Sequence, residues 1–163
     1  MGVRTVQQVA ILNKARIKLN LTQINSSGSR IVGALTKFGH TGPKHHGIII
    51  GQNIFDGKVY VAESRHTTGY VLATYDNFIE RYSPIADIHL YANDGQYSDR
   101  EVAQRALTEI DSGGNGEYNL IVNNCESFSN RAMYNHSNSN QIINFAVGGL
   151  VLASAFWVIR HAK

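Results

Sequence analysis

The chain has few of the residues that build disulfide or metal frameworks. Of its 163 residues only Cys125 is a cysteine, which excludes an intramolecular disulfide and a cysteine-rich zinc site. Only two prolines occur, and hydrophobic residues make up 43% against 17% charged, which excludes a wholly disordered chain. A chain of this length can bury a hydrophobic core without disulfides or metal sites, so we expect a globular domain that carries a single thiol.

Acidic residues are missing from the first third of the chain. Residues 1–55 carry seven Lys or Arg and no Asp or Glu, whereas residues 56–126 carry all twelve acids against five bases. This layout predicts a basic N-terminal segment, residues 1–30, that lies on its own acidic domain or on anionic lipid. No basic run is dense and no aromatic residues alternate with the bases, so no nucleic-acid partner is expected.

A long stretch without charge lies near the end of the chain. As a helix, residues 142–159 would be roughly 27 Å long, close to the hydrocarbon thickness of a bilayer of about 30 Å. The alternative is a buried core helix, but that would show a polar stripe, and between Phe145 and Ile159 only Ser154 is polar. We expect a single-pass C-terminal membrane anchor with the preceding domain in the cytoplasm. Its small residues, Gly148 among them, permit self-association.

Short apolar runs between turn residues fill the middle of the chain and predict a small antiparallel sheet. Residues 47–51 and 58–63 are expected to pair as a hairpin, because β-branched residues flank the Asp56-Gly57 turn. The other predicted elements are strands over 70–75 and 88–91, helices over 75–81, 98–110 (behind a Ser98–Glu101 capping box) and 126–134, an amphipathic helix over 1–20, and a loop-rich segment over 25–44.

The lone thiol of Cys125 lies where a helix is predicted to begin. A thiol in the first turn of a helix faces unpaired N–H groups and the positive end of the helix dipole, which favours the thiolate. The alternative is that Cys125 is a small buried hydrophobe. Its neighbours Asn123, Asn124 and Glu126 are polar, which favours the reactive interpretation.

Two adjacent histidines, His45 and His46, begin the first predicted strand. Because neighbours in a strand point to opposite faces, only one of them can share the side of Cys125. The same alternation separates the second strand into a set of Val59, Val61 and Glu63 and a set of Tyr60, Ala62 and Ser64. A carboxylate such as Glu63 can orient an imidazole, as in a cysteine-histidine-acid triad.

The order of these elements resembles the lecithin:retinol acyltransferase family. The shared features are a His-x-Gly-Ile strand, a second strand ending in a polar residue, a helix, and then Asn124-Cys125-Glu126-x-Phe128. Closest in layout are the H-Ras-like suppressor phospholipase/acyltransferases, which also end in a hydrophobic membrane anchor. The resemblance implies an α+β, circularly permuted papain-like fold, with a small antiparallel sheet packed against helices in residues 31–135 and a C-terminal hydrophobic helix.

The resemblance also implies a catalytic site. Cys125 is then the nucleophile, His45 the base, and Glu63 the third polar residue, with neither metal nor cofactor. Three positions differ from the animal enzymes: Ser127 and Glu63 each stand where histidine is common, and His46 replaces an aromatic residue. His46 therefore remains the alternative base.

The implied function is that of a thiol-dependent acyl hydrolase or acyltransferase acting on an ester of a membrane lipid through a thioester on Cys125. The expected partners are a lipid membrane and an acyl-lipid substrate. Two other functions stay open: a cysteine peptidase or amidase of the same superfamily, and a catalytically silent membrane adaptor that keeps the fold.

Overall fold

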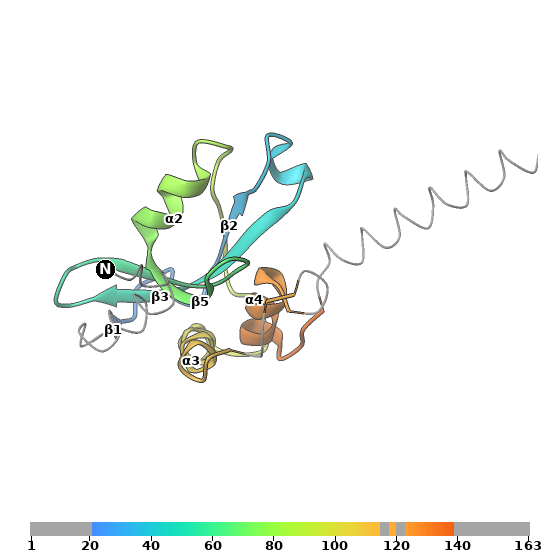
Figure 1. Ribbon diagram of the computed structural model, residues 1–163. Coiled ribbons are helices and arrows are strands. Elements are labelled where there is room, and N and C mark those ends of the chain that lie inside the picture. Colours follow the sequence, from blue (N-terminus) through green and yellow to red (C-terminus); the bar gives the residue numbers. More distant parts are fainter. Residues whose placement is uncertain (1–20, 115–117, 120–122, 139–163) are drawn as a thin grey trace, which may run out of the picture.

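A computed structural model describes residues 21–114, 118–119 and 123–138 (Figure 1). Among these residues no helix is long and apolar enough to cross a bilayer. The helix expected over residues 1–20 and the membrane anchor expected over 142–159 lie outside the described residues, so both stay predictions.

The core of the fold is a six-stranded antiparallel sheet. Its strands follow the order β5-β4-β3-β2-β6, and β1 pairs with the far end of β3. The strands are β1 Leu21–Thr22, β2 Arg30–Ala34, β3 Lys44–Asn53, β4 Val59–Arg65, β5 Gly69–Thr74 and β6 His89–Tyr91. The helices are the 3-10 turn η1 Gly39–Thr41, α2 Tyr75–Tyr82, α3 Asp99–Asp111 and α4 Cys125–Tyr134. The expected α+β class with a small antiparallel sheet is confirmed.

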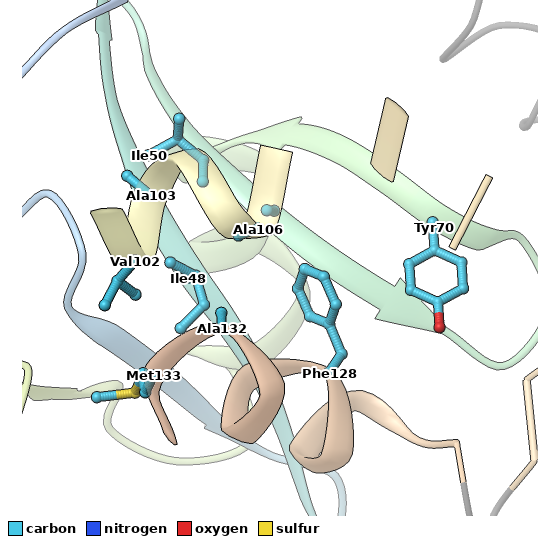
Figure 2. Packing of buried hydrophobic residues seen from close by; sticks show 10 residues of the cluster. Ile48, Ile50, Tyr70, Val102, Ala103, Ala106, Phe128, Ala132 and Met133 are labelled. Carbon is cyan, nitrogen blue, oxygen red and sulfur yellow. The ribbon is translucent and has the colours of Figure 1, made fainter. Parts of the chain in front are cut away.

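Helices cover both faces of the sheet, with α2 on one side and α3 and α4 on the other (Figure 1). On the α2 side, Val61 of β4 packs in one cluster with Phe78. On the other side, Ala62 packs with Phe128 of α4, and Figure 2 shows how α3 and α4 contribute to this second cluster. The predicted alternation of β4 between two faces is therefore confirmed.

Phe128 fixes α4 on the sheet. Its side chain is fully buried and meets the ring of Tyr70 edge to face at 5.7 Å between centroids. Burial of a side chain of this size contributes about 2–3 kcal/mol to the free energy of unfolding. The position of α4, and with it the position of Cys125 at its first residue, therefore depends on the apolar core.

The segment predicted to be loop-rich, residues 25–44, also contains β2 and the η1 turn, which the sequence analysis did not predict. β2 lies between β3 and β6, and both Ile31 and Val32 are buried. Its apolar run is only Ile31 and Val32, bounded by Arg30 and Gly33, so it shows no period-2 alternation. The strand forms because β3 and β6 supply its backbone hydrogen bonds and because the rest of the fold buries Ile31 and Val32.

The predicted capping box of α3 is confirmed. The Ser98 hydroxyl accepts a hydrogen bond from the Glu101 backbone N–H, and the Glu101 carboxylate accepts one from the Ser98 N–H at 2.9 Å. On the other face, α2 begins behind the N-cap Thr74 and ends at Tyr82, two residues before Pro84. Local sequence signals therefore set the start of α3 and the end of α2.

Two glycines make room for polar groups on the α2 side of the sheet. A Cβ at Gly33 would lie 2.6 Å from Tyr82, and Gly33 pairs with His45 across the β2–β3 ladder. A Cβ at Gly47 would lie 3.3 Å from the Cγ of Glu63, its partner on β4. The absence of both side chains lets Tyr82 and Glu63 come close to His45.

Candidate active site

Cys125 is the first residue of α4. The side chain of its N-cap, Asn124, accepts hydrogen bonds from the backbone N–H groups of Glu126 and Ser127 at 3.0 and 2.9 Å. The expected helix is observed, starting one residue earlier than predicted. Cys125 is 3% exposed, and its thiol donates to the Lys44 carbonyl at 3.7 Å. The thiol is therefore buried beside polar groups at the positive end of a helix.

His45 lies between the thiol and a carboxylate. Its ring interacts with the Cys125 side chain, and its Nε2 lies 2.7 Å from Oε2 of Glu63. Because Nε2 is occupied by Glu63, Nδ1 is the nitrogen left for the thiol. Burial lowers the pKa of His45, but the hydrogen bonds to Cys125 and Glu63 and their charges outweigh this and raise it to about 9. The imidazole is therefore protonated at neutral pH.

Glu63 is fully buried and binds three cationic groups. Besides His45 it accepts hydrogen bonds from Nη2 of Arg65 and from Nη2 of Arg81, each at 2.7 Å. Burial raises the pKa of Glu63, but the bonds from His45 and Arg65 dominate and hold it at about 2. Arg81 belongs to α2 and Glu63 to β4, so this carboxylate joins the helix to the sheet.

Aromatic rings of α2 cover the imidazole. The Tyr82 ring stacks on His45 with 5.2 Å between centroids, and the Phe78 ring lies at 5.9 Å. Arg81 places its guanidinium over the Tyr82 ring at 4.7 Å and donates to its hydroxyl at 2.8 Å. The ring of His45 is therefore fixed by stacking as well as by its two hydrogen bonds.

His46 has a different environment, on the opposite face of β3. Its pKa is lowered to about 3 by burial and by the positive charge of Arg30, with Glu126 acting in the other direction. The imidazole is therefore neutral at neutral pH. The structure brings Cys125, His45 and Glu63 together and leaves His46 outside this group.

Tyr118 is a residue of this site that the sequence reasoning missed. Its hydroxyl interacts with both the side chain and the backbone of Cys125. Burial and the charge of Cys125 raise the pKa of Tyr118 to about 12, so its phenol keeps its proton. Its ring meets His66 edge to face at 5.4 Å. Seven residues separate Tyr118 from Cys125, and no spacing rule links them.

Comparison with known proteins adds no relative, since no protein-family profile, no curated protein and no solved structure matches this chain.

The charges at Glu63 make the stability of the fold depend on pH. The pKa of His45 is raised from 6.5 to about 9, so its contribution is complete below pH 6.5 and is lost as the pH rises towards 9. The pKa of Glu63 is lowered from 4.5 to about 2, so its contribution is complete above pH 4.5 and is lost as the pH falls towards 2. The free energy of unfolding should therefore be largest between pH 4.5 and 6.5.

Replacing Glu63 by Gln should remove the acid slope and reduce the alkaline slope, because Cys125 still raises the pKa of His45. Because Arg65, Arg81 and His45 then lose their buried counter-charge, Glu63→Gln should cost on the order of 3 kcal/mol within that plateau, measured by chemical denaturation across the pH range. Glu109→Gln is the matched control: Glu109 pairs with Arg131 in a more exposed bridge, so its loss should be about 1 kcal/mol with both slopes kept. Equal losses in the two variants would contradict this account.

Proposed function

We propose that the chain is a cysteine-dependent acyl hydrolase or acyltransferase that acts on an ester of a membrane lipid through a thioester on Cys125. One observation carries the proposal: the thiol at the start of α4 interacts with His45, whose Nε2 lies 2.7 Å from a buried carboxylate. A nucleophile, an acid–base group and an orienting group in contact are the parts that acyl transfer needs.

The first half of the reaction forms the thioester. His45 already carries the proton that the thiol gives up, and the Cys125 thiolate attacks the carbonyl carbon of the ester. As the tetrahedral intermediate collapses, the bond from carbon to the leaving oxygen breaks and His45 protonates the departing alcohol. In the second half, water or an acceptor gives a proton to His45 and attacks the thioester carbonyl, and the Cys125 thiolate is released beside the protonated imidazole. Glu63 stabilises the imidazolium in both halves.

The oxyanion of the intermediate is stabilised by two donors beside the sulfur. The backbone N–H of Cys125 and the Tyr118 hydroxyl interact in the free protein. When the carbonyl oxygen of the substrate enters, it takes the place of this contact and accepts from both groups. Donors held in place before the reaction stabilise developing charge strongly in a site from which water is excluded.

The arrangement of the chain supports a permuted papain-like fold. The histidine strand β3 precedes the cysteine helix α4 in sequence, and the sheet is antiparallel with helices on both faces. This order supports the resemblance to the lecithin:retinol acyltransferase family and its phospholipase/acyltransferase members. The apolar run of residues 142–159 favours a lipid substrate, because a C-terminal anchor holds the site at a membrane and permits self-association.

The dyad itself is tested by labelling of the thiol. Cys125 should react with iodoacetamide at neutral pH much faster than a free cysteine peptide, because the adjacent imidazolium favours thiolate. His45→Asn should remove this enhancement and the esterase activity, whereas His46→Asn is the matched control on the opposite face of β3 and should keep both. Circular dichroism verifies that each variant is folded.

Two results would redirect the proposal. Slow labelling that is unaffected by His45→Asn would exclude the thiolate and leave a silent adaptor. Fast labelling with turnover of peptides, and none of phospholipid vesicles, would leave a cysteine peptidase or amidase, because the same groups attack an amide carbonyl.

Tyr118 is tested separately from the dyad. Tyr118→Phe keeps the ring but removes the hydroxyl, so kcat on a soluble thioester should fall by about 10–100-fold while KM changes little. Labelling of Cys125 should stay fast, because His45 and Glu63 are untouched. Tyr97→Phe is the control for loss of a phenol hydroxyl elsewhere in the domain. Unchanged kcat in Tyr118→Phe would remove Tyr118 from the oxyanion site.

A further inference from the structure

The turn between β2 and β3 carries exposed apolar side chains. Residues 35–43, called the hairpin tip here, include Phe38, which is 78% exposed, and Leu35, which is 45% exposed. The loop after α2 lies beside the tip and adds Ile85 at 36%. A Cβ at Gly39 would lie 3.9 Å from Ala86, which fixes the two segments as neighbours. Together they form an apolar projection at the top of Figure 1.

The hairpin tip is held in one conformation. The Leu35 N–H donates to the Pro43 carbonyl at 3.0 Å, and the Thr41 hydroxyl donates to the Phe38 carbonyl at 2.7 Å. His40 contacts the Asp87 carbonyl at 2.7 Å and stacks on His89 with 3.7 Å between ring centroids. Phe38 is therefore presented to solvent by a braced turn, although burying it would lower the free energy.

The hairpin tip continues directly from the candidate active site. Ala34 pairs with Lys44, whose carbonyl accepts from the Cys125 thiol, and His45 is the next residue of β3. Four residues separate Ala34 from Phe38, so the chain can place them at most about 14 Å apart. A surface that covers Phe38 therefore lies at the end of β3 that carries Lys44 and His45.

The charge around the hairpin tip favours an anionic surface. Lys37 and Lys44 flank the apolar residues, and residues 31–44 contain no acid. The neighbouring loop adds one carboxylate, Asp87, so the net charge of the projection is positive. The opposite end of β3 offers a contrast: Ile54 and Phe55 are exposed there at 53% and 63%, but Asp56 follows them.

We propose that the hairpin tip docks on the surface of an anionic phospholipid bilayer, with Phe38 and Leu35 among the acyl chains and Lys37 among the headgroup phosphates. Apolar residues on a fixed turn beside cations are suited to the interface of a bilayer. The apolar run of residues 142–159 begins four positions after Asn138, the last described residue. A bilayer that holds this run would therefore be connected to the domain by only a few residues. The inference rests on the proposed function for its substrate, a lipid ester brought next to Cys125.

A single tryptophan at the hairpin tip tests the docking. In the full chain, Trp157→Phe removes the natural tryptophan, and Phe38→Trp places one at the tip. With vesicles of phosphatidylserine and phosphatidylcholine, its emission should shift to shorter wavelength and be quenched by brominated phospholipid. Phe55→Trp in the same background is the matched control, and it should show neither effect although any C-terminal anchor is retained.

The outcomes separate the possible occupants of the hairpin tip. Lys37→Glu should weaken binding to the vesicles, so that the lipid concentration needed for half of the maximal emission shift rises roughly fivefold. Equal responses of the two reporter positions would overturn the proposal. An emission shift that occurs without vesicles and grows with protein concentration would overturn the proposal in favour of a second copy of the chain. An emission shift that occurs without vesicles at every protein concentration would overturn it in favour of residues 1–20 covering the hairpin tip.

Activity assays keep this inference distinct from the proposed function. Phe38→Ser should lower turnover of phospholipid in anionic vesicles by about tenfold and leave turnover of a soluble short-chain thioester unchanged, with Phe55→Ser as the control. If the wild-type chain turns over neither substrate, the proposed function fails, while the fluorescence result still shows whether the hairpin tip docks on the bilayer. If Phe38→Ser loses nothing on vesicles, the docking has no role in substrate delivery and that part of the inference fails.

Discussion

A single buried carboxylate organises the candidate site. Glu63 has no exposed surface, yet it binds an imidazole and two guanidinium groups that come from β3, β4 and α2. Because an unpaired charge in such a place is very costly, these elements must meet with their polar groups aligned. The glycines opposite Tyr82 and Glu63 provide the space, and the sheet provides the register. The geometry of the thiol contact follows from this arrangement.

The alternation of a β-strand separates two adjacent histidines into two chemical environments. His45 faces Glu63 and Cys125, where negative charge raises its pKa to about 9. His46 faces Arg30, where burial and positive charge lower its pKa to about 3. The two side chains are identical, so the difference comes from the partners on each face of the sheet. An imidazolium beside a helix-start thiol is the arrangement that favours a reactive thiolate.

Some of this architecture could be predicted from local signals in the sequence. The capping box at Ser98, the helix after Asn124 and the β4 alternation each depend on neighbouring residues, and all three are observed. β2 could not be predicted, because its strand character comes from β3 and β6. Tyr118 was missed for a similar reason: its contact with Cys125 is set by the path of the intervening chain. The two arginines on Glu63 are likewise brought together only by the fold.

The central claim is that Cys125 carries the acyl group during turnover. The most direct test is intact-protein mass spectrometry after rapid acid quenching of the full chain with a phospholipid or an activated acyl ester. The account predicts a mass increase of one acyl group, located on Cys125 by peptide mapping, removed by hydroxylamine at neutral pH and absent in Cys125→Ala. Turnover of substrate with no acyl group on Cys125, or unchanged turnover in Cys125→Ala, would contradict it.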